Sequence, residues 1–210
     1  MSELTSNDQI DVRHQKLARL RALGINPYPT RFIRSTDNST LAEKYADLPD
    51  DTATEDRVIV AGRVYSIRNS GMFIDLRDSV GKIQIFSHRD TTPEESLGIL
   101  PLVDVGDIIG VEGLIRRTKR GELTINAEKI TMLCKSLRPM PEKYHGLSDV
   151  EQRYRRRYLD IMSNEDSKQR MLNRSRIITE IRSFMASEGF LEVETPMLHS
   201  VYGGATAEPF

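Results

Sequence analysis

Apolar and polar residues alternate in two neighbouring stretches near the middle of the chain, 71–77 and 82–86. Alternation of this kind is typical of β-strands with one buried face, and residues 78–81 between them have the composition of a turn. We therefore predict a β-hairpin. The apolar face, which we expect in the core, consists of Met72, Ile74, Leu76, Ile83 and Ile85.

The opposite face of this hairpin carries an aromatic ring and an amide. Phe73, Asp75 and Arg77 point outward from the first strand, and Gln84 points outward from the second. With a turn of residues 78–81, Asp75 faces Gln84, and Phe73 lies diagonal to Gln84 and within its reach. A nucleic-acid base can stack on such a ring while the amide hydrogen-bonds to it.

The hairpin belongs to a predicted set of five strands, with a partly helical segment between the third and fourth. This is the strand order of an OB-fold, a small Greek-key barrel that binds single-stranded nucleic acid, although other small barrels have similar strand counts. Taken alone, an outward Phe73 would be half covered by a neighbouring element. Beside Gln84, Arg77 and Arg68 in this barrel, base stacking is the favoured interpretation. The predicted strands are 58–67, 72–77, 82–87, 107–116 and 123–132, and the helical segment is 93–102.

The loop between the last two strands contains four cations in five residues, Arg116, Arg117, Lys119 and Arg120. In this fold the loop is one of the places that contact the ligand, and its cations could bind phosphates. Glu122 lies among them and could accept hydrogen bonds from base N–H groups or neutralise its neighbours. The alternative is a hairpin tip that is charged for solubility.

Helical patterns flank the predicted barrel. A helix over 6–23 ends at Gly24, and a short helix over 40–45 precedes an acidic loop over 48–55. Arg13, Lys16, Arg19 and Arg21 of the first helix form either the solvated face of a docked helix, the favoured interpretation, or a positive surface for a phosphate backbone. The predicted helix-capping pairs of the chain are Ser6 with Gln9, Thr40 with Glu43, Ser148 with Glu151, and Ser163 with Asp166.

After the barrel, the segment Arg138-Pro-Met-Pro141 breaks regular structure. A helix is predicted over 148–160, whose basic middle, 153–158, is either solvated or packed between domains. A longer amphipathic helix over 163–187 follows, closed by Gly189, and a strand over 190–195 ends at Pro196.

The composition excludes several classes of protein. The 210 residues have a formal charge of -1, so any nucleic-acid site must depend on local clusters of cations. Cys134 is the single cysteine, which fits a reducing compartment. No apolar run approaches the length of a membrane span, and the polar N-terminus is unlike a secretory signal, so we expect a cytoplasmic protein. The four histidines lack metal-ligand spacing, and no metal site is expected.

Residues 189–198 (GFLEVETPML), which follow a long amphipathic helix, resemble motif 1 of the class II aminoacyl-tRNA synthetases. An OB barrel before motif 1 resembles the subgroup that charges lysine, aspartate and asparagine. Three stretches are similar to the lysine-charging branch and argue against the other two: 16–29 (KLARLRALGINPYP), 138–147 (RPMPEKYHGL) with 153–160 (RYRRRYLD), and 203–210 (GGATAEPF).

The resemblance implies an α+β fold: an N-terminal helix, the five-stranded OB barrel, then the helix and first strand of a truncated catalytic domain. It divides the chain into a helical segment 1–56, an anticodon-binding barrel 57–137, a hinge 138–162 and the start of the catalytic domain 163–210. Phe73 would stack on the central anticodon uridine, Gln84 and Arg68 would hydrogen-bond it, and Glu122 would contact a neighbouring base.

The resemblance also implies an activity for the full-length enzyme. Lysine would react with Mg-ATP to give lysyl-adenylate, and the lysyl group would pass to tRNA(Lys). In this family motif 2, with its ATP-binding arginine, and the glycine-rich motif 3 come later than residue 210, so we assign no catalytic residue here. The ATP and Mg2+ that the resemblance implies belong to the full-length enzyme, and we expect neither a bound cofactor nor adenylate formation from this chain alone. The loop with Gly203, Gly204 and Ala205 would lie near the lysine pocket, with Glu208 where the family often has a basic residue.

Motif 1 forms the homodimer interface in this family. The residues that the resemblance assigns to that interface are Ile178, Ile181, Phe184, Phe190 and Pro196. Two other functions stay open from the sequence: a stand-alone OB module that binds single-stranded RNA or DNA without chemistry, and an aspartate- or asparagine-charging enzyme.

Overall fold

The computed structural model describes residues 6–141, 147 and 149–196. The chain divides into two compact units, residues 1–140 and 141–210. Each unit is described below by itself.

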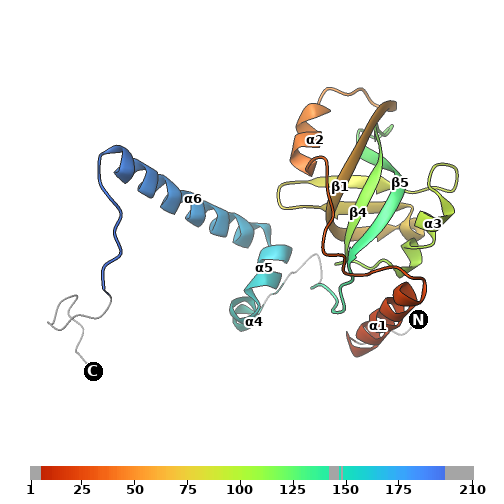
Figure 1. The fold of residues 1–210 in the computed structure, drawn as a ribbon, viewed down its shortest axis with the longest axis horizontal. Helices are drawn as coiled ribbons and strands as arrows, with labels where there is room; N and C mark the ends of the chain where they lie inside the picture. Colours follow the sequence, from red (N-terminus) through yellow and green to blue (C-terminus); the bar gives the residue numbers. More distant parts are fainter. Residues whose placement is uncertain (1–5, 142–146, 148, 197–210) are drawn as a thin grey trace. The chain divides into compact units, whose positions relative to one another are not determined.

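A closed five-stranded barrel forms the body of the first unit (Figure 1). The strand order is β1-β2-β3-β5-β4, and the barrel closes where β3 pairs with β5 in parallel, while all other pairs are antiparallel. The barrel confirms the predicted OB-fold architecture. The strands are β1 (Thr52–Arg68), β2 (Phe73–Arg77), β3 (Lys82–Phe86), β4 (Ile108–Arg117) and β5 (Leu123–Cys134).

The inward residues of the strands make an aliphatic core, as the alternation predicted. Ile74, Leu76 and Ile85 are fully buried, and Ile83 is 4% exposed. Met72 was wrongly placed on this core face. It is half-buried and has helical backbone angles after the short 3-10 turn η1 (Asn69–Gly71), because β2 begins only at Phe73.

The first strand is longer than expected. β1 begins at Thr52, where the sequence predicted an acidic loop, because its N-terminal end pairs with the end of β4, Thr52 opposite Arg117. An irregularity between Ala53 and Arg57 separates this pair from the main ladder. The predicted helical segment before β4 is present as α3 (Glu94–Leu97) and the 3-10 helix η2 (Leu100–Leu102). Leu100 and Leu102 belong to the buried core.

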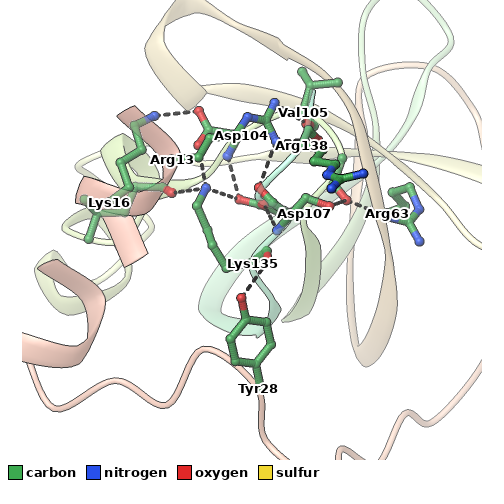
Figure 2. A network of polar contacts seen from close by, with 12 residues as sticks. Arg13, Lys16, Tyr28, Arg63, Asp104, Val105, Asp107, Lys135 and Arg138 are labelled. Atoms are coloured by element: carbon green, nitrogen blue, oxygen red, sulfur yellow. Dashed lines mark hydrogen bonds and ion pairs between the residues drawn. The ribbon is translucent and has the colours of Figure 1, made fainter. Parts of the chain in front are cut away.

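A polar network fixes α1 (Ser6–Ala22) to the barrel (Figure 2). Arg13 is 8% exposed and donates to the carbonyl oxygens of Ser136 at 3.0 Å and Val105 at 2.9 Å. Lys16 binds Asp104 at 2.6 Å. The sequence assigned these two cations to a solvated face or to a phosphate surface, but Arg13 is buried and Lys16, which is 25% exposed, is paired with Asp104. Arg19 and Arg21 are exposed.

A fully buried lysine lies at the centre of this network. Lys135 Nζ contacts Asp104 at 2.5 Å and Asp107 at 2.7 Å and donates to the carbonyl of Leu102 at 2.9 Å. Burial alone would raise the pKa of the Asp104 carboxyl, but hydrogen bonds from Lys135 and Lys16 outweigh burial and lower that pKa below its ordinary value. The charged form of Asp104 is therefore the form that the folded barrel stabilises.

The ends of the helices in the first unit follow local backbone chemistry. α1 ends as predicted at Gly24, which has a φ of 74° and donates its N–H to the Arg21 carbonyl, while the Ile25 N–H donates to the Leu20 carbonyl, a Schellman-type end. α2 (Asn38–Lys44) begins earlier than predicted. Its N-cap is Asp37, which accepts from the Thr40 amide at 2.8 Å, so Thr40 lies inside the helix.

The second unit is helical, with α4 (Val150–Arg155), α5 (Arg157–Ser163) and α6 (Glu165–Ser187). The single helix predicted over 148–160 is interrupted at Arg156. Asp149 caps α4 by accepting from Gln152, while the predicted cap Ser148 lies outside the described residues. Asn164, not Ser163, caps α6 by accepting from the amides of Asp166 and Ser167.

The structure of the second unit differs from two further predictions made from the sequence. The basic run 153–158 is not simply solvated, because Arg153 and Arg157 bind the buried carboxylate of Asp160 at 3.0 Å and 2.9 Å. Residues 190–195 do not form the predicted strand and are exposed. A strand requires a neighbouring strand for its backbone hydrogen bonds, and no described residue provides one here.

Candidate nucleic-acid interface

The barrel register brings outward side chains of separate strands into rows that run across the sheet. One row, which we call the amide row, contains Ser66, Asp75, Gln84 and Arg116 together with Thr124, which is fully buried. The next row, the aromatic row, contains Arg68, Phe73, Phe86 and Asn126. The pairing of Asp75 with Gln84 confirms the predicted register, and it leaves Phe73 diagonal to Gln84 as expected.

Phenylalanine rings form the centre of the aromatic row. The Phe73 and Phe86 centroids are 5.2 Å apart, and the Phe86 and His88 centroids are 6.0 Å apart with planes only 7° from parallel. Phe73 and Phe86 are half-buried and alternate with the fully buried Ile74 and Ile85, so both lie on the outer face of the sheet. Sequence reasoning missed Phe86 as a site residue, although the same alternation pointed it outward.

Arginines lie over both rings. The guanidinium carbon of Arg68 is 5.9 Å from the Phe73 centroid, and that of Arg116 is 4.9 Å from the Phe86 centroid. Nε of Arg116 is buried without a hydrogen-bond partner among the described residues. The result is a strip in which cations and π-faces alternate, a surface that suits bases joined by phosphates.

Hydrogen bonds within the amide row orient its polar groups. Arg68 binds one oxygen of Asp75 at 2.9 Å, and the Ser66 hydroxyl donates to the other. The Thr124 hydroxyl lies 3.0 Å from the side-chain oxygen of Gln84. With that oxygen engaged, the amide N–H groups of Gln84 can donate to a ligand, and the carbonyl edge of a pyrimidine has the acceptors that they require.

The four cations of the β4–β5 loop have different environments. Arg117 donates to the carbonyl oxygens of Gly121 at 2.7 Å, Tyr45 at 2.6 Å and Ala46 at 3.2 Å. Lys119 is exposed and lies 3.7 Å from Asp51.

Arg120 and Glu122 are exposed as well. Because Arg117 donates to three backbone carbonyls, it stabilises the loop and its contact with the end of α2. The side chains of Lys119, Arg120 and Glu122 extend into solvent.

The candidate residues of the second unit lie on an exposed apolar face of α6 and the segment after it. Ile181, Phe184 and Phe190 are 57%, 62% and 63% exposed, Ile178 is 36% exposed, and Pro196 is exposed. A hollow of about 560 Å³ lies between α6 and residues 190–192. The predicted loop with Gly203, Gly204 and Ala205 lies outside the described residues.

Two searches of the described residues gave negative results. None of their helices is long and apolar enough to cross a membrane. They also contain no group of three or more histidine, cysteine, aspartate or glutamate side chains arranged to bind a metal ion.

Two protein families match this chain. Residues 58–133, which include most of the barrel, match the OB-fold nucleic acid binding domain. Residues 149–210 match the family described as tRNA synthetases class II (D, K and N).

Full-length relatives extend the similarity over nearly the whole chain. It is 65% identical to the lysine–tRNA ligases of Sinorhizobium medicae and Agrobacterium fabrum, over 98% of this chain and 41% of each relative. Identity to the lysine–tRNA ligase of Staphylococcus epidermidis is 47%, over 97% of this chain and 42% of the relative. The chain thus spans about two-fifths of the length of the curated relatives it matches.

Proposed function

The chain belongs to the class II tRNA synthetases of the D, K and N group, and on this premise we propose that it is the tRNA-recognition part of a lysine–tRNA ligase. Its similarity to lysine–tRNA ligases extends through both units. The observation that carries the proposal is the pairing of the aromatic and amide rows on the outer face of the barrel.

Phe73 and Gln84 are the proposed centre of anticodon recognition. A uridine stacks on the Phe73 ring, and its carbonyl oxygens accept hydrogen bonds from Gln84 and from Arg68, which Asp75 orients. Glu122 accepts from the N–H group of a neighbouring base. Stacking of one base on one aromatic ring contributes about 1–3 kcal/mol to binding, which is enough for selection when hydrogen bonds add direction.

Phosphates of the anticodon loop bind to the cations around this site. We assign this role to Lys119 and Arg120 of the β4–β5 loop and to Arg116, whose guanidinium lies over Phe86. Arg117 is removed from the proposed set, because three carbonyl oxygens already bind its guanidinium.

The whole protein, as proposed, joins lysine to tRNA(Lys) in the cytoplasm with ATP and Mg2+. The described residues contain no group of three or more histidine, cysteine, aspartate or glutamate side chains that could hold a metal ion. What these residues contribute is selection of the tRNA and orientation of its anticodon.

The exposed apolar face of α6 is the proposed homodimer surface. Ile181, Phe184 and Phe190 expose more than half of their side-chain area to solvent. Contiguous apolar surface of this kind marks interaction sites in soluble proteins. Burial of Ile178 and Pro196 with them in a second copy would remove this exposure.

A titration of the 210-residue chain with two RNA stem-loops tests the proposal. One stem-loop carries the lysine anticodon, and the other carries the same loop nucleotides in scrambled order. We expect tighter binding of the lysine loop, and we expect the ratio of the two affinities to persist when the salt concentration is raised. Equal affinities at both salt concentrations would contradict anticodon recognition.

A second candidate function follows from the strip of arginines and rings. Such strips also bind single strands without regard to sequence, because every base has a π-face. A stand-alone module of that kind would bind the lysine loop, the scrambled loop and single-stranded DNA with similar affinity. The same titration with DNA added therefore separates the two functions.

A further inference from the structure

A third row of outward side chains follows the amide row along the strands, and it is cationic. Arg63 of β1 pairs with Arg77 of β2, and Arg77 pairs with Lys82 of β3. On β2 and β3 this cation row lies two residues beyond Asp75 and Gln84, a distance of about 7 Å along the strands. Arg77 and Lys82 are exposed.

The cations of this row face one another without acidic partners. Among the described residues, no ion pair joins Arg77 or Lys82 to a carboxylate. Asp78 is next in sequence, but its side chain is only 6% exposed and accepts hydrogen bonds from Asn38, Val80 and Gly81. Like charges on directly opposed strand positions destabilise a sheet, so this row lowers the stability of the barrel. Solubility alone would not require the cations to occupy opposed positions.

Contacts on the barrel position the row toward solvent. The Arg77 guanidinium lies over the Tyr65 ring, 4.4 Å from its centroid, which fixes the charge on the outer face. Arg63, the cross-strand partner of Arg77, donates to the carbonyl of Gly106 at 2.7 Å. Lys82, at the end of the hairpin, forms no ion pair with any residue that the structure describes.

The row leads into the β4–β5 loop. Gln84 pairs with Thr124 in the parallel ladder, so the positions two residues earlier on each strand, Lys82 and Glu122, lie at the same level. Glu122 therefore lies beside Lys82, and the exposed cations Lys119 and Arg120 precede Glu122 in the β4–β5 loop. Arg77 and Lys82 lie alongside the amide row, where the bases are proposed to bind.

We propose that Arg77 and Lys82 bind the phosphates of the RNA strand whose bases occupy the amide and aromatic rows. This inference rests on the proposed function and adds a backbone site to it. The RNA then crosses the strands with its bases over Phe73 and Gln84 and its phosphates along Arg77, Lys82 and the β4–β5 loop.

The salt dependence of binding tests the cation row. Each lost phosphate contact lowers the slope of log affinity against log salt by about 0.7 for a single strand. The double variant Arg77→Gln with Lys82→Gln should lower the slope by about 1.4 and leave the ratio of lysine-loop to scrambled-loop affinity unchanged. Arg77→Lys, which keeps the charge, should keep the slope.

Lys129→Gln is the matched control, because Lys129 is exposed on β5 but lies five residues beyond Thr124. Its slope should equal that of the wild type. A second readout uses a set of lysine-anticodon stem-loops, in each of which one phosphate is replaced by a neutral methylphosphonate. At least one position should weaken binding to the wild type and have no effect on the double variant.

The outcomes separate this inference from the proposed function. If the double variant has the same salt slope as the wild type, the cation row is overturned. Anticodon recognition would still be supported in that case if Phe73→Ala reduces the ratio of lysine-loop to scrambled-loop affinity. A lowered slope without any selectivity in the wild type supports the row and overturns anticodon recognition. A wild type that binds neither RNA overturns both. Thermal unfolding midpoints confirm that each variant is folded.

Discussion

The Phe73 and Phe86 rings, direct cross-strand partners, are tilted by 48° with their centroids 5.2 Å apart. Since the planes are not parallel, one flat base cannot stack on both. The two rings therefore do not form one continuous stacking surface, and Phe86 is further covered by Arg116 and by the nearly parallel His88 ring.

Substitution of Phe73 tests base stacking. Phe73→Ala should cost about 1–3 kcal/mol in binding of the lysine anticodon stem-loop and less for the scrambled loop, because only the correct loop places a uridine on this ring. Fluorescence anisotropy with both RNAs measures the difference, with Phe73→Tyr as the control that retains a ring. An equal loss for both loops would remove specific stacking.

Asp75 orients Arg68, and its charge can be removed with little change of shape. Asp75→Asn should reduce the ratio of lysine-loop to scrambled-loop affinity, because Arg68 loses its ion pair and the surface becomes more positive toward any RNA. The thermal midpoint should stay nearly constant, since the pair is 52% and 39% exposed and such pairs add little stability. A constant ratio would argue that Arg68 takes no part in recognition.

The β4–β5 loop offers a paired comparison. Arg120→Ala should lower the salt slope by about 0.7 without changing the unfolding midpoint, because Arg120 is exposed.

Arg117→Ala should lower the free energy of unfolding by about 1.5–3 kcal/mol, because three carbonyl oxygens lose a charged donor. A lower free energy of unfolding in Arg120→Ala, together with an unchanged one in Arg117→Ala, would contradict the structure of the loop.

The Asp104 carboxyl predicts a pH dependence of stability. Its pKa is lowered in the folded barrel, so its contribution is fully present above the ordinary aspartate pKa of about 4 and is lost as pH falls below that value. Asp104→Asn should lower the unfolding free energy at neutral pH by about 1.5–3 kcal/mol, because Lys135 and Lys16 lose a charged acceptor. Urea titrations from pH 7 to pH 3 should show the wild-type and variant values converging at the acid end. A constant difference across this range would contradict the assignment.

Gly113 lies where a side chain has no room. A Cβ there would lie 1.9 Å from the Asn126 carbonyl oxygen, so the β4–β5 ladder must shift. Gly113→Ala should destabilise the barrel by about 1–3 kcal/mol. Gly98→Ala is the control, because its nearest neighbouring atom would be 3.4 Å away, and we expect a change within about 0.5 kcal/mol.

Much of the barrel could be predicted from the sequence, because a half-buried strand repeats its pattern every two residues. That period placed Ile74, Leu76 and Ile85 inside and Phe73 and Gln84 outside. The same argument failed at Met72, since a turn with left-handed angles at Asn69 and Ser70 delays the strand. It also failed for residues 190–195, where pattern alone cannot supply a partner strand.

Contacts between residues distant in sequence could not be predicted. Arg13 is bound by carbonyl oxygens 92 and 123 residues away, and Arg117 by carbonyls 71 and 72 residues away. A backbone acceptor has no sequence signature, because every residue carries one. The sequence therefore cannot distinguish a cationic side chain that binds a helix or loop to the barrel from one that binds a phosphate.

Closure of the barrel by the parallel β3·β5 pair has a kinetic consequence. Gln84 and Thr124 are 40 residues apart, and their pairing joins two hairpins that can each form locally. Contacts of such long range form late and slowly, because the entropy of loop closure must be overcome first. An RNA that recognises the joined rows would bind only chains that have completed this step, so the rate at which binding competence appears after dilution from denaturant would time the joining of β3 to β5.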